Sequence, residues 1–189
     1  TPQPGQMRLW AWQAVARGAD MVSFFRWRSC RWGREQYWHG LLYHHGQPQR
    51  RYQEAKALGA ELAALSKELD GTTVESQVGI LFDYDSIWAL ETQPCAQGFD
   101  YIALCREYAQ AFARLGVTAD GVSLDSDLSR YDLLIAPSMH LITPEGAERL
   151  KAYVHNGGTL LLGPRSGVKD TEDAVVDALL PGLLREPAG

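Results

Sequence analysis

Short apolar segments alternate with helical segments over residues 78–162, and this alternation constrains the fold more than any other feature. Helices are predicted over residues 101–115 and 144–156, and a Gly-Gly pair at 157–158 separates the second helix from the next apolar run. That order is typical of a helix C-cap followed by a return into a parallel sheet. We therefore predict a doubly wound, flavodoxin-like or Rossmann-like parallel sheet with helices on both faces. Its strands are expected at residues 78–83, 120–124, 131–136 and 159–162.

The first 70 residues follow a different pattern. A helix is predicted over residues 7–17, ending at Gly18, and a second helix over residues 52–69. Between them, residues 20–28 (DMVSFFRWR) are short, continuous and aromatic, which predicts a buried parallel strand. A long irregular loop follows this segment. The break near residue 70 predicts two domains, residues 1–70 and 71–189.

Composition and charge exclude several classes of protein. A chain that is 46% hydrophobic and 22% charged is neither disordered nor fibrous. Its apolar runs are far shorter than the roughly 18 residues of a membrane span, so no membrane partner is expected. Residues 1–60 hold nine Lys and Arg against three acids and five of the six Trp, but the net charge of −5 opposes phosphate binding. We therefore expect no nucleic-acid partner.

Cofactor and metal sites are not expected either. No glycine-rich phosphate loop follows a predicted strand. Cys30, Cys95 and Cys105 are odd in number and lack CxxC spacing, which argues against disulfides and structural zinc and favours a reducing, cytoplasmic location. Asp83 and Asp85, at a strand end, have two interpretations: a divalent-ion site, or capping of the loop, which we favour.

Two further residues of the second part raise the hypothesis of an amidotransferase-like or small-ligand enzyme. Ser138 follows a predicted strand, where a hydrolase nucleophile stands, and His140 is two residues away. The glycines of a nucleophile elbow are missing, so a turn serine with a nearby loop histidine is the favoured interpretation. Cys105 falls on the apolar side of its helix and is expected in the core.

The loop after residues 20–28 is the most informative stretch. Carboxylates and imidazoles bind sugar hydroxyls, while an aromatic face covers the apolar side of a sugar ring. The same residues also suit an ion-pair network that braces a loop over a Trp-containing core, and composition alone does not separate the two interpretations. The polar and aromatic side chains concerned are Arg26, Arg28, Glu35, Trp38, His39, His44 and His45.

Three motifs carry a resemblance to a known family. PGQMRLW at 4–10, FFRWR at 24–28 and EQYWHG at 35–40 closely resemble the end of the catalytic barrel in β-galactosidases of glycoside hydrolase family 42. The α/β part that follows is similar to the family's middle domain, a flavodoxin-like, glutamine-amidotransferase-like fold through which these enzymes trimerise. The resemblance thus covers nearly the whole chain. It implies the last unit of a (β/α)8 barrel followed by a trimerisation domain.

The resemblance also implies a retaining hydrolase of terminal β-D-galactosyl groups that uses two catalytic glutamates. Neither has a match in this chain, so a fragment without catalytic residues is expected. Glu35 matches the family glutamate that binds sugar hydroxyls, and Phe25 matches an aromatic that lines the ring subsite. Many members have a histidine three residues after that glutamate, where this sequence has Trp38 followed by His39. Trp38, His39 or both are therefore expected to contact the sugar.

The expected partners follow from the same resemblance. A β-galactoside is the implied substrate and a homo-oligomer, a trimer, the implied assembly. Because the chain opens on Thr1 and reaches Trp10 within a dense apolar pattern, we expect it to be a piece of a longer protein. The alternative from another class is a non-catalytic α/β assembly module.

Overall fold

The computed structural model describes residues 1–94 and 96–189, so that Cys95 lies outside the described residues. The chain divides into two compact units. The N-terminal unit is Thr1–Val74, and the C-terminal unit is Glu75–Gly189.

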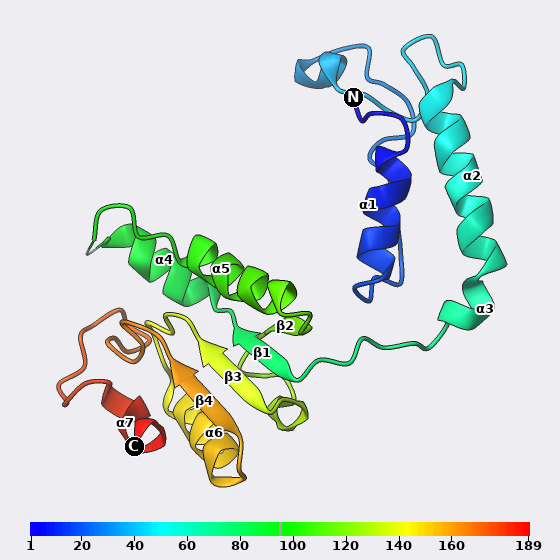
Figure 1. Ribbon diagram of the computed structural model, residues 1–189. Helices are drawn as coiled ribbons and strands as arrows, with labels where there is room; N and C mark the ends of the chain where they lie inside the picture. Colours follow the sequence, from blue (N-terminus) through cyan, green and yellow to red (C-terminus); the bar gives the residue numbers. More distant parts are fainter. Residues whose placement is uncertain (95) are drawn as a thin grey trace. The chain divides into compact units, whose positions relative to one another are not determined.

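Two helices form the frame of the N-terminal unit. Helix α1 (Gln6–Val15) packs beside α2 (Arg50–Ala64), and the short α3 (Ser66–Leu69) follows (Figure 1). Glu61 of α2 ties the pair together, because its carboxylate accepts hydrogen bonds from Arg8 Nε at 2.8 Å and Trp12 Nε1 at 3.0 Å. Both predicted helices are confirmed, although the second is interrupted between α2 and α3.

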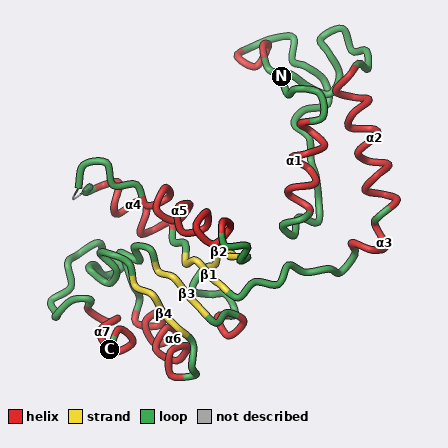
Figure 2. The backbone as a smooth tube through the Cα atoms, in the orientation of Figure 1, coloured by secondary structure: helices red, strands yellow, loops and turns green. Residues whose placement is uncertain are grey.

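The predicted strand over residues 20–28 is wrong for this structure. Figure 2 shows the segment as loop, and in the described chain it makes only an isolated bridge between Arg28 and Leu42. A strand needs a continuous ladder of backbone partners, and none of the described segments supplies one here. Its aromatic residues are consequently not buried: the Phe25 side chain is 73% exposed. The apolar and aromatic pattern was taken as a buried strand, but burial and pairing depend on neighbours that the sequence pattern cannot show.

A four-stranded parallel sheet forms the centre of the C-terminal unit. The strand order is β2-β1-β3-β4, and β1 pairs with both β2 and β3. All four strands lie within or at the edge of the predicted segments. Their bounds are Val78–Leu81 for β1, Ala119–Val122 for β2, Leu133–Ala136 for β3 and Thr159–Leu162 for β4.

Helices cover both faces of this sheet (Figure 1). Ile80 of β1 joins an apolar cluster with α4 (Tyr84–Thr92) and α5 (Tyr101–Arg114), whereas the adjacent Leu81 joins the cluster under α6 (Pro144–His155). Successive residues of a strand point to opposite faces, so both sides of β1 are buried. This confirms a parallel α/β sheet with a helical layer on each face. Short helices complete the unit: η2 (Leu128–Arg130), η3 (Gly182–Leu184) and α7 (Arg185–Ala188).

Local capping signals set the ends of these helices. Asp100 caps α5 by accepting from Ala103 N at 2.9 Å, and Thr143 caps α6 by accepting from Gly146 N at 2.9 Å. Helix α6 ends before Gly157, whose φ of 97° suits glycine and turns the chain into β4, as the Gly-Gly pair predicts. Helix α4 is an element that the sequence analysis did not predict. None of the helices described in residues 1–94 and 96–189 combines the length and hydropathy needed to cross a lipid bilayer.

Candidate functional site

In the N-terminal unit, backbone hydrogen bonds join residues 26–27 to residues 41–42 across the long loop. Leu41 N donates to Arg26 O and Leu42 N to Trp27 O, both at 2.8 Å. Gly40 is required at this crossing, because a Cβ there would lie 2.6 Å from the carbonyl carbon of Arg28. These hydrogen bonds hold the FFRWR segment (24–28) against the end of the EQYWHG segment (35–40). Residues of the two motifs therefore become neighbours in space.

Arg26 connects two of the predicted site residues. Its guanidinium forms an ion pair with the Glu35 carboxylate, and its Cζ atom lies 5.4 Å from the centroid of the Phe25 ring. Glu35 lies in the short helix η1 (Arg34–Tyr37), while Arg28 donates to the His44 carbonyl at 2.8 Å. Both arginines therefore brace the loop, and Arg26 also sets the direction of the Glu35 carboxylate.

Phe25 and His39 line one pocket of about 440 Å³. Its wall is mostly apolar and includes Met7 and Trp10 of α1, and Arg51 of α2 also lines it. Desolvation by the surrounding chain, together with the positive charge of Arg51, lowers the pKa of His39. The His39 imidazole is therefore largely neutral at pH 7, with one nitrogen able to donate a hydrogen bond and the other able to accept one.

The other two predicted residues are placed differently. Trp38 directly follows η1 with its side chain 57% exposed, and it is not among the described residues that line this pocket. Glu35 is also off the pocket wall and is joined to Phe25 only through Arg26. The structure thus places Phe25 and His39 on the wall of one pocket. Glu35 is linked to Phe25 only through Arg26, and Trp38 does not line the pocket.

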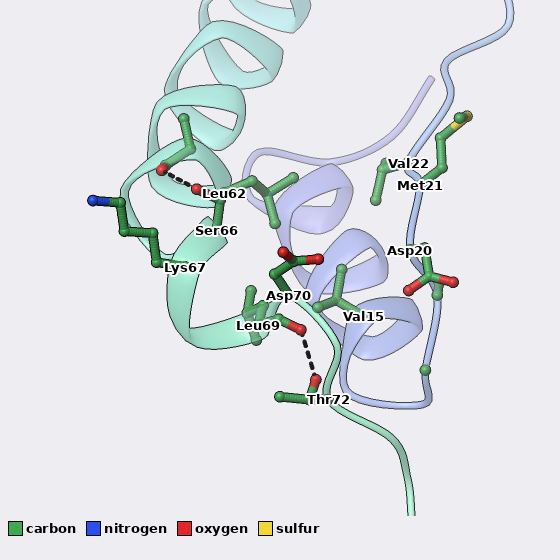
Figure 3. A pocket seen from close by; sticks show the side chains of 13 residues that line it. Val15, Asp20, Met21, Val22, Leu62, Ser66, Lys67, Leu69, Asp70 and Thr72 are labelled. Atoms are coloured by element: carbon green, nitrogen blue, oxygen red, sulfur yellow. Dashed lines mark hydrogen bonds between the residues drawn. The ribbon is translucent and has the colours of Figure 1, made fainter.

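A second pocket of the N-terminal unit, of about 530 Å³, lies between the end of α1 and the α2–α3 junction (Figure 3). Asp20 and Asp70 are its acidic side chains. Two of its hydroxyls already have partners, because Ser66 donates to Ala63 O at 2.9 Å and Thr72 donates to Leu69 O at 2.8 Å. None of the four predicted sugar-binding residues lines this pocket, so the pocket with Phe25 and His39 is the stronger candidate site.

Family models cover both units of the chain. Residues 76–189 match the model described as the β-galactosidase trimerisation domain, and residues 1–65 match the model described as β-galactosidase of glycoside hydrolase family 42. This chain belongs to glycoside hydrolase family 42. The resemblance seen in the three sequence motifs is confirmed.

Relatives in family 42 are much longer than this chain. The β-galactosidase Bga of Halorubrum lacusprofundi is 46% identical over the whole chain, which covers 27% of that protein. A solved β-galactosidase structure from Halorubrum lacusprofundi, 46% identical, has a TM-score of 0.84 over 97% of this chain and 27% of its own. The β-galactosidase from Bacillus circulans sp. alkalophilus has a TM-score of 0.88 at 34% identity, over 97% of this chain and 27% of its own. The chain thus spans little more than a quarter of these relatives.

The competing candidates in the C-terminal unit of this family 42 chain do not form a site. Ser138 and His140 are both buried; the Ser138 hydroxyl has no hydrogen-bond partner in the described chain, and His140 Nδ1 lies 3.1 Å from Arg165 O. The pair therefore lacks the nucleophile-to-base hydrogen bond of a hydrolase. Asp83 caps α4 by accepting from Ser86 N at 2.8 Å, in line with the favoured interpretation. The described residues contain no group of three or more His, Cys, Asp or Glu placed to hold a metal ion.

Cys105 gives a direct test of the amidotransferase-like alternative. Burial raises the pKa of its thiol, so the reactive thiolate is scarce at neutral pH. In a Cys30→Ser/Cys95→Ser variant, we expect an aromatic disulfide reagent at pH 8 to label Cys105 at least about 100-fold more slowly in buffer than in denaturing urea. Labelling at the same rate in both solutions would show an exposed, activated thiol and would revive that alternative.

Arg51 is a residue of the pocket that the sequence analysis missed. Within α2 it shares the buried face with Leu58, seven residues later, which is the spacing of one helical stripe. An arginine at a position of the apolar stripe of a helix is unusual, and this is the feature of the sequence that could have identified Arg51 as a buried residue.

Proposed function

We propose that this chain is part of a β-galactosidase that hydrolyses terminal β-D-galactosyl groups with retention of configuration, and that its N-terminal unit supplies part of the galactose pocket. The observation that carries the proposal is the shared pocket of Phe25 and His39, with Glu35 held beside Phe25 through Arg26. These residues lie inside the segment that matches the β-galactosidase model. The β-galactoside substrate follows from this membership together with the pocket.

The pocket chemistry suits a neutral sugar. The exposed Phe25 ring offers an apolar face to the C–H side of a pyranose, and a neutral His39 can donate to or accept from a hydroxyl. The Glu35 carboxylate accepts hydrogen bonds from vicinal hydroxyls. Trp38 stays an alternative contact, since its exposed ring directly precedes His39. We favour His39 because it lines the pocket.

The catalytic glutamates are proposed to lie elsewhere in a longer polypeptide. Retaining glycosidases place two carboxyl groups about 5 to 5.5 Å apart, one as acid and base and the other as nucleophile. The only acids of residues 1–60 are Asp20, Glu35 and Glu54. Glu35 is paired with Arg26 and Glu54 with Arg50, so neither is a free acid of such a pair. By itself the chain is therefore expected to be inactive.

Domain roles follow from the same proposal. Residues 1–70 would be the last unit of a (β/α)8 barrel, and residues 71–189 a flavodoxin-like trimerisation domain. The strand order β2-β1-β3-β4 supports the second assignment, since it is the order of the first four strands in flavodoxin-like sheets. Free thiols at Cys30 and Cys105 favour the cytoplasm. A non-catalytic assembly module is the second candidate, favoured by the match to the trimerisation model.

The decisive experiment uses the longer protein to which this chain is proposed to belong, called the full-length protein below. We expect it to hydrolyse a nitrophenyl β-D-galactoside with the β-anomer as first product, and to have three times its chain mass by light scattering. A trimer without hydrolysis would leave only the assembly role. An active monomer would remove the assembly role, and a protein with neither property would overturn the proposal.

A further inference from the structure

Arg26 is, among the described residues, the only hydrogen-bond donor to the Glu35 side chain. Its Nη1 atom donates to Glu35 Oε2 in an ion pair, and such charge-assisted bonds are directional as well as strong. The second carboxylate oxygen, Oε1, accepts no hydrogen bond from a described residue. One oxygen of Glu35 is therefore held by the protein, while the other is an unused acceptor.

The unused oxygen is accessible to a ligand. The side chains of Arg26 and Glu35 are 29% and 43% exposed, and Glu35 Oε1 is not one of the buried atoms that lack a partner. The backbone fixes both residues, because Arg26 O accepts from Leu41 N at 2.8 Å and Trp38 N donates to Glu35 O at 2.9 Å. The position of Oε1 is therefore set by the main chain together with the ion pair.

Holding a side chain in place before the substrate arrives strengthens binding. A flexible side chain that becomes ordered on binding costs about a 2- to 10-fold loss of affinity. Without Arg26, the Glu35 side chain would rotate freely, and this cost would fall on substrate binding. Because the ion pair is partly exposed, it contributes little to the stability of the fold. Orientation of Glu35 is therefore the main effect that we expect from this ion pair.

We propose that Arg26 is a positioning residue for galactoside binding: by holding Glu35 Oε2, it directs Oε1 to one hydroxyl group of the galactosyl ring. The inference rests on the proposed function in one respect, that Glu35 binds a sugar hydroxyl. It adds the oxygen that makes this contact and the residue on which the contact depends. Arg26 also lies over Phe25, with Cζ 5.4 Å from the ring centroid, so the same guanidinium supports the aromatic side of the pocket.

The test measures kcat/KM of the full-length protein on a nitrophenyl β-D-galactoside and on deoxy analogues that each lack one sugar hydroxyl. Arg26→Met removes the donor, while the flexible methionine side chain still packs on Phe25. On the parent galactoside we expect Arg26→Met to lower kcat/KM by about 5-fold or more, the cost of ordering Glu35. The analogue on which Glu35→Ala has the smallest effect lacks the hydroxyl that Glu35 binds. On that analogue Arg26→Met should stay within about twofold of wild type.

Arg28→Met is the matched control in the same motif. Arg28 donates to the His44 carbonyl at 2.8 Å and so braces the loop without an ion pair to Glu35. We expect Arg28→Met to lower kcat/KM by one common factor on all the substrates, because a shifted loop changes every sugar contact. Arg26→Lys is the conservative variant. Because a single nitrogen of Arg26 makes the bond to Glu35, the lysine ammonium can replace it and should keep kcat/KM within about twofold of wild type.

A loss for Arg26→Met that is equal on every substrate would overturn the inference, because Arg26 would then only brace the loop as Arg28 does. A misfolded fraction cancels from the ratio of two substrates measured on one variant. A loss below about twofold on the parent galactoside would also overturn the inference. So would a loss that disappears on a different analogue from the one found with Glu35→Ala, because Arg26 itself would then bind a hydroxyl. In these cases the wild-type protein is active and the proposed function stands, whereas a wild-type protein that hydrolyses no galactoside would overturn both.

Discussion

We expect Glu35→Ala in the full-length protein to lower kcat/KM for a β-galactoside by about 100-fold, which corresponds to about 2.7 kcal/mol of transition-state stabilisation. Glu35 is held by Arg26, which also contacts Phe25 at the edge of the pocket. A carboxylate that is already oriented makes strong hydrogen bonds to sugar hydroxyls, and such bonds strengthen in the oxocarbenium-like transition state. Steady-state kinetics on a nitrophenyl galactoside measures the loss.

Two variants separate sugar binding from a structural role of Glu35. Glu61 is also an ion-paired glutamate of the N-terminal unit, with Arg8 and Trp12 as its partners, so Glu61→Ala should keep kcat/KM within about twofold. Glu35→Gln keeps an oxygen acceptor and should recover part of the activity. If Glu35→Ala itself stays within about twofold of wild type, below about 0.5 kcal/mol, the sugar-contact role is wrong.

The second large effect concerns the core of the C-terminal unit. Leu134→Ala should lower the free energy of unfolding of this unit by about 3 kcal/mol, within the range of about 2 to 5 kcal/mol for buried leucines. Leu134 is fully buried in β3, and its Cδ2 atom lies 2.6 Å from where a Cβ on Gly79 of β1 would be. Leucine therefore fills the space that the absent glycine side chain leaves, and its truncation to alanine would open a cavity there.

Leu161→Ala is the matched control for this measurement. Leu161 lies in the adjacent strand β4 but is 43% exposed, so its truncation should destabilise the unit by less than about 1 kcal/mol. Urea unfolding followed by circular dichroism gives both values on the same transition. Equal losses for the two variants would mean that β3 is not the buried centre of the sheet.

Local signals allowed the C-terminal unit to be predicted in outline. Asp100 and Thr143 cap helices through bonds that span only three residues, and Gly157 ends α6 through its own backbone conformation. Such interactions depend on near neighbours in the chain, so they can be recognised in sequence. Helix α4 has the same kind of cap, from Asp83 to Ser86 N, and its buried Ile87 and Leu90 lie three residues apart. It was missed because Asp83 and Asp85 were interpreted only as a loop cap or an ion site.

The site was predictable in part. The three motifs identified Phe25, Glu35, Trp38 and His39 as a group and the family to which the chain belongs. Which of these residues line the pocket depends on backbone hydrogen bonds between segments about 15 residues apart, such as that from Leu41 N to Arg26 O. These bonds place Phe25 and His39 on one pocket. Periodicity carries no information on such crossings, and for this reason the role of Trp38 stayed open.

By itself, the sequence determined the four strands of the C-terminal unit, the helices α5 and α6 between them, the parallel α/β class and the family, because these depend on periodicity, caps and motif spacing. Only the tertiary structure decided that residues 20–28 form no ladder, and that the buried Arg51 lines the same pocket as Phe25 and His39. Burial and pairing are properties of the whole set of neighbours. A strand or a buried charge is therefore completed by segments distant in sequence, and its local pattern cannot reveal whether they are present.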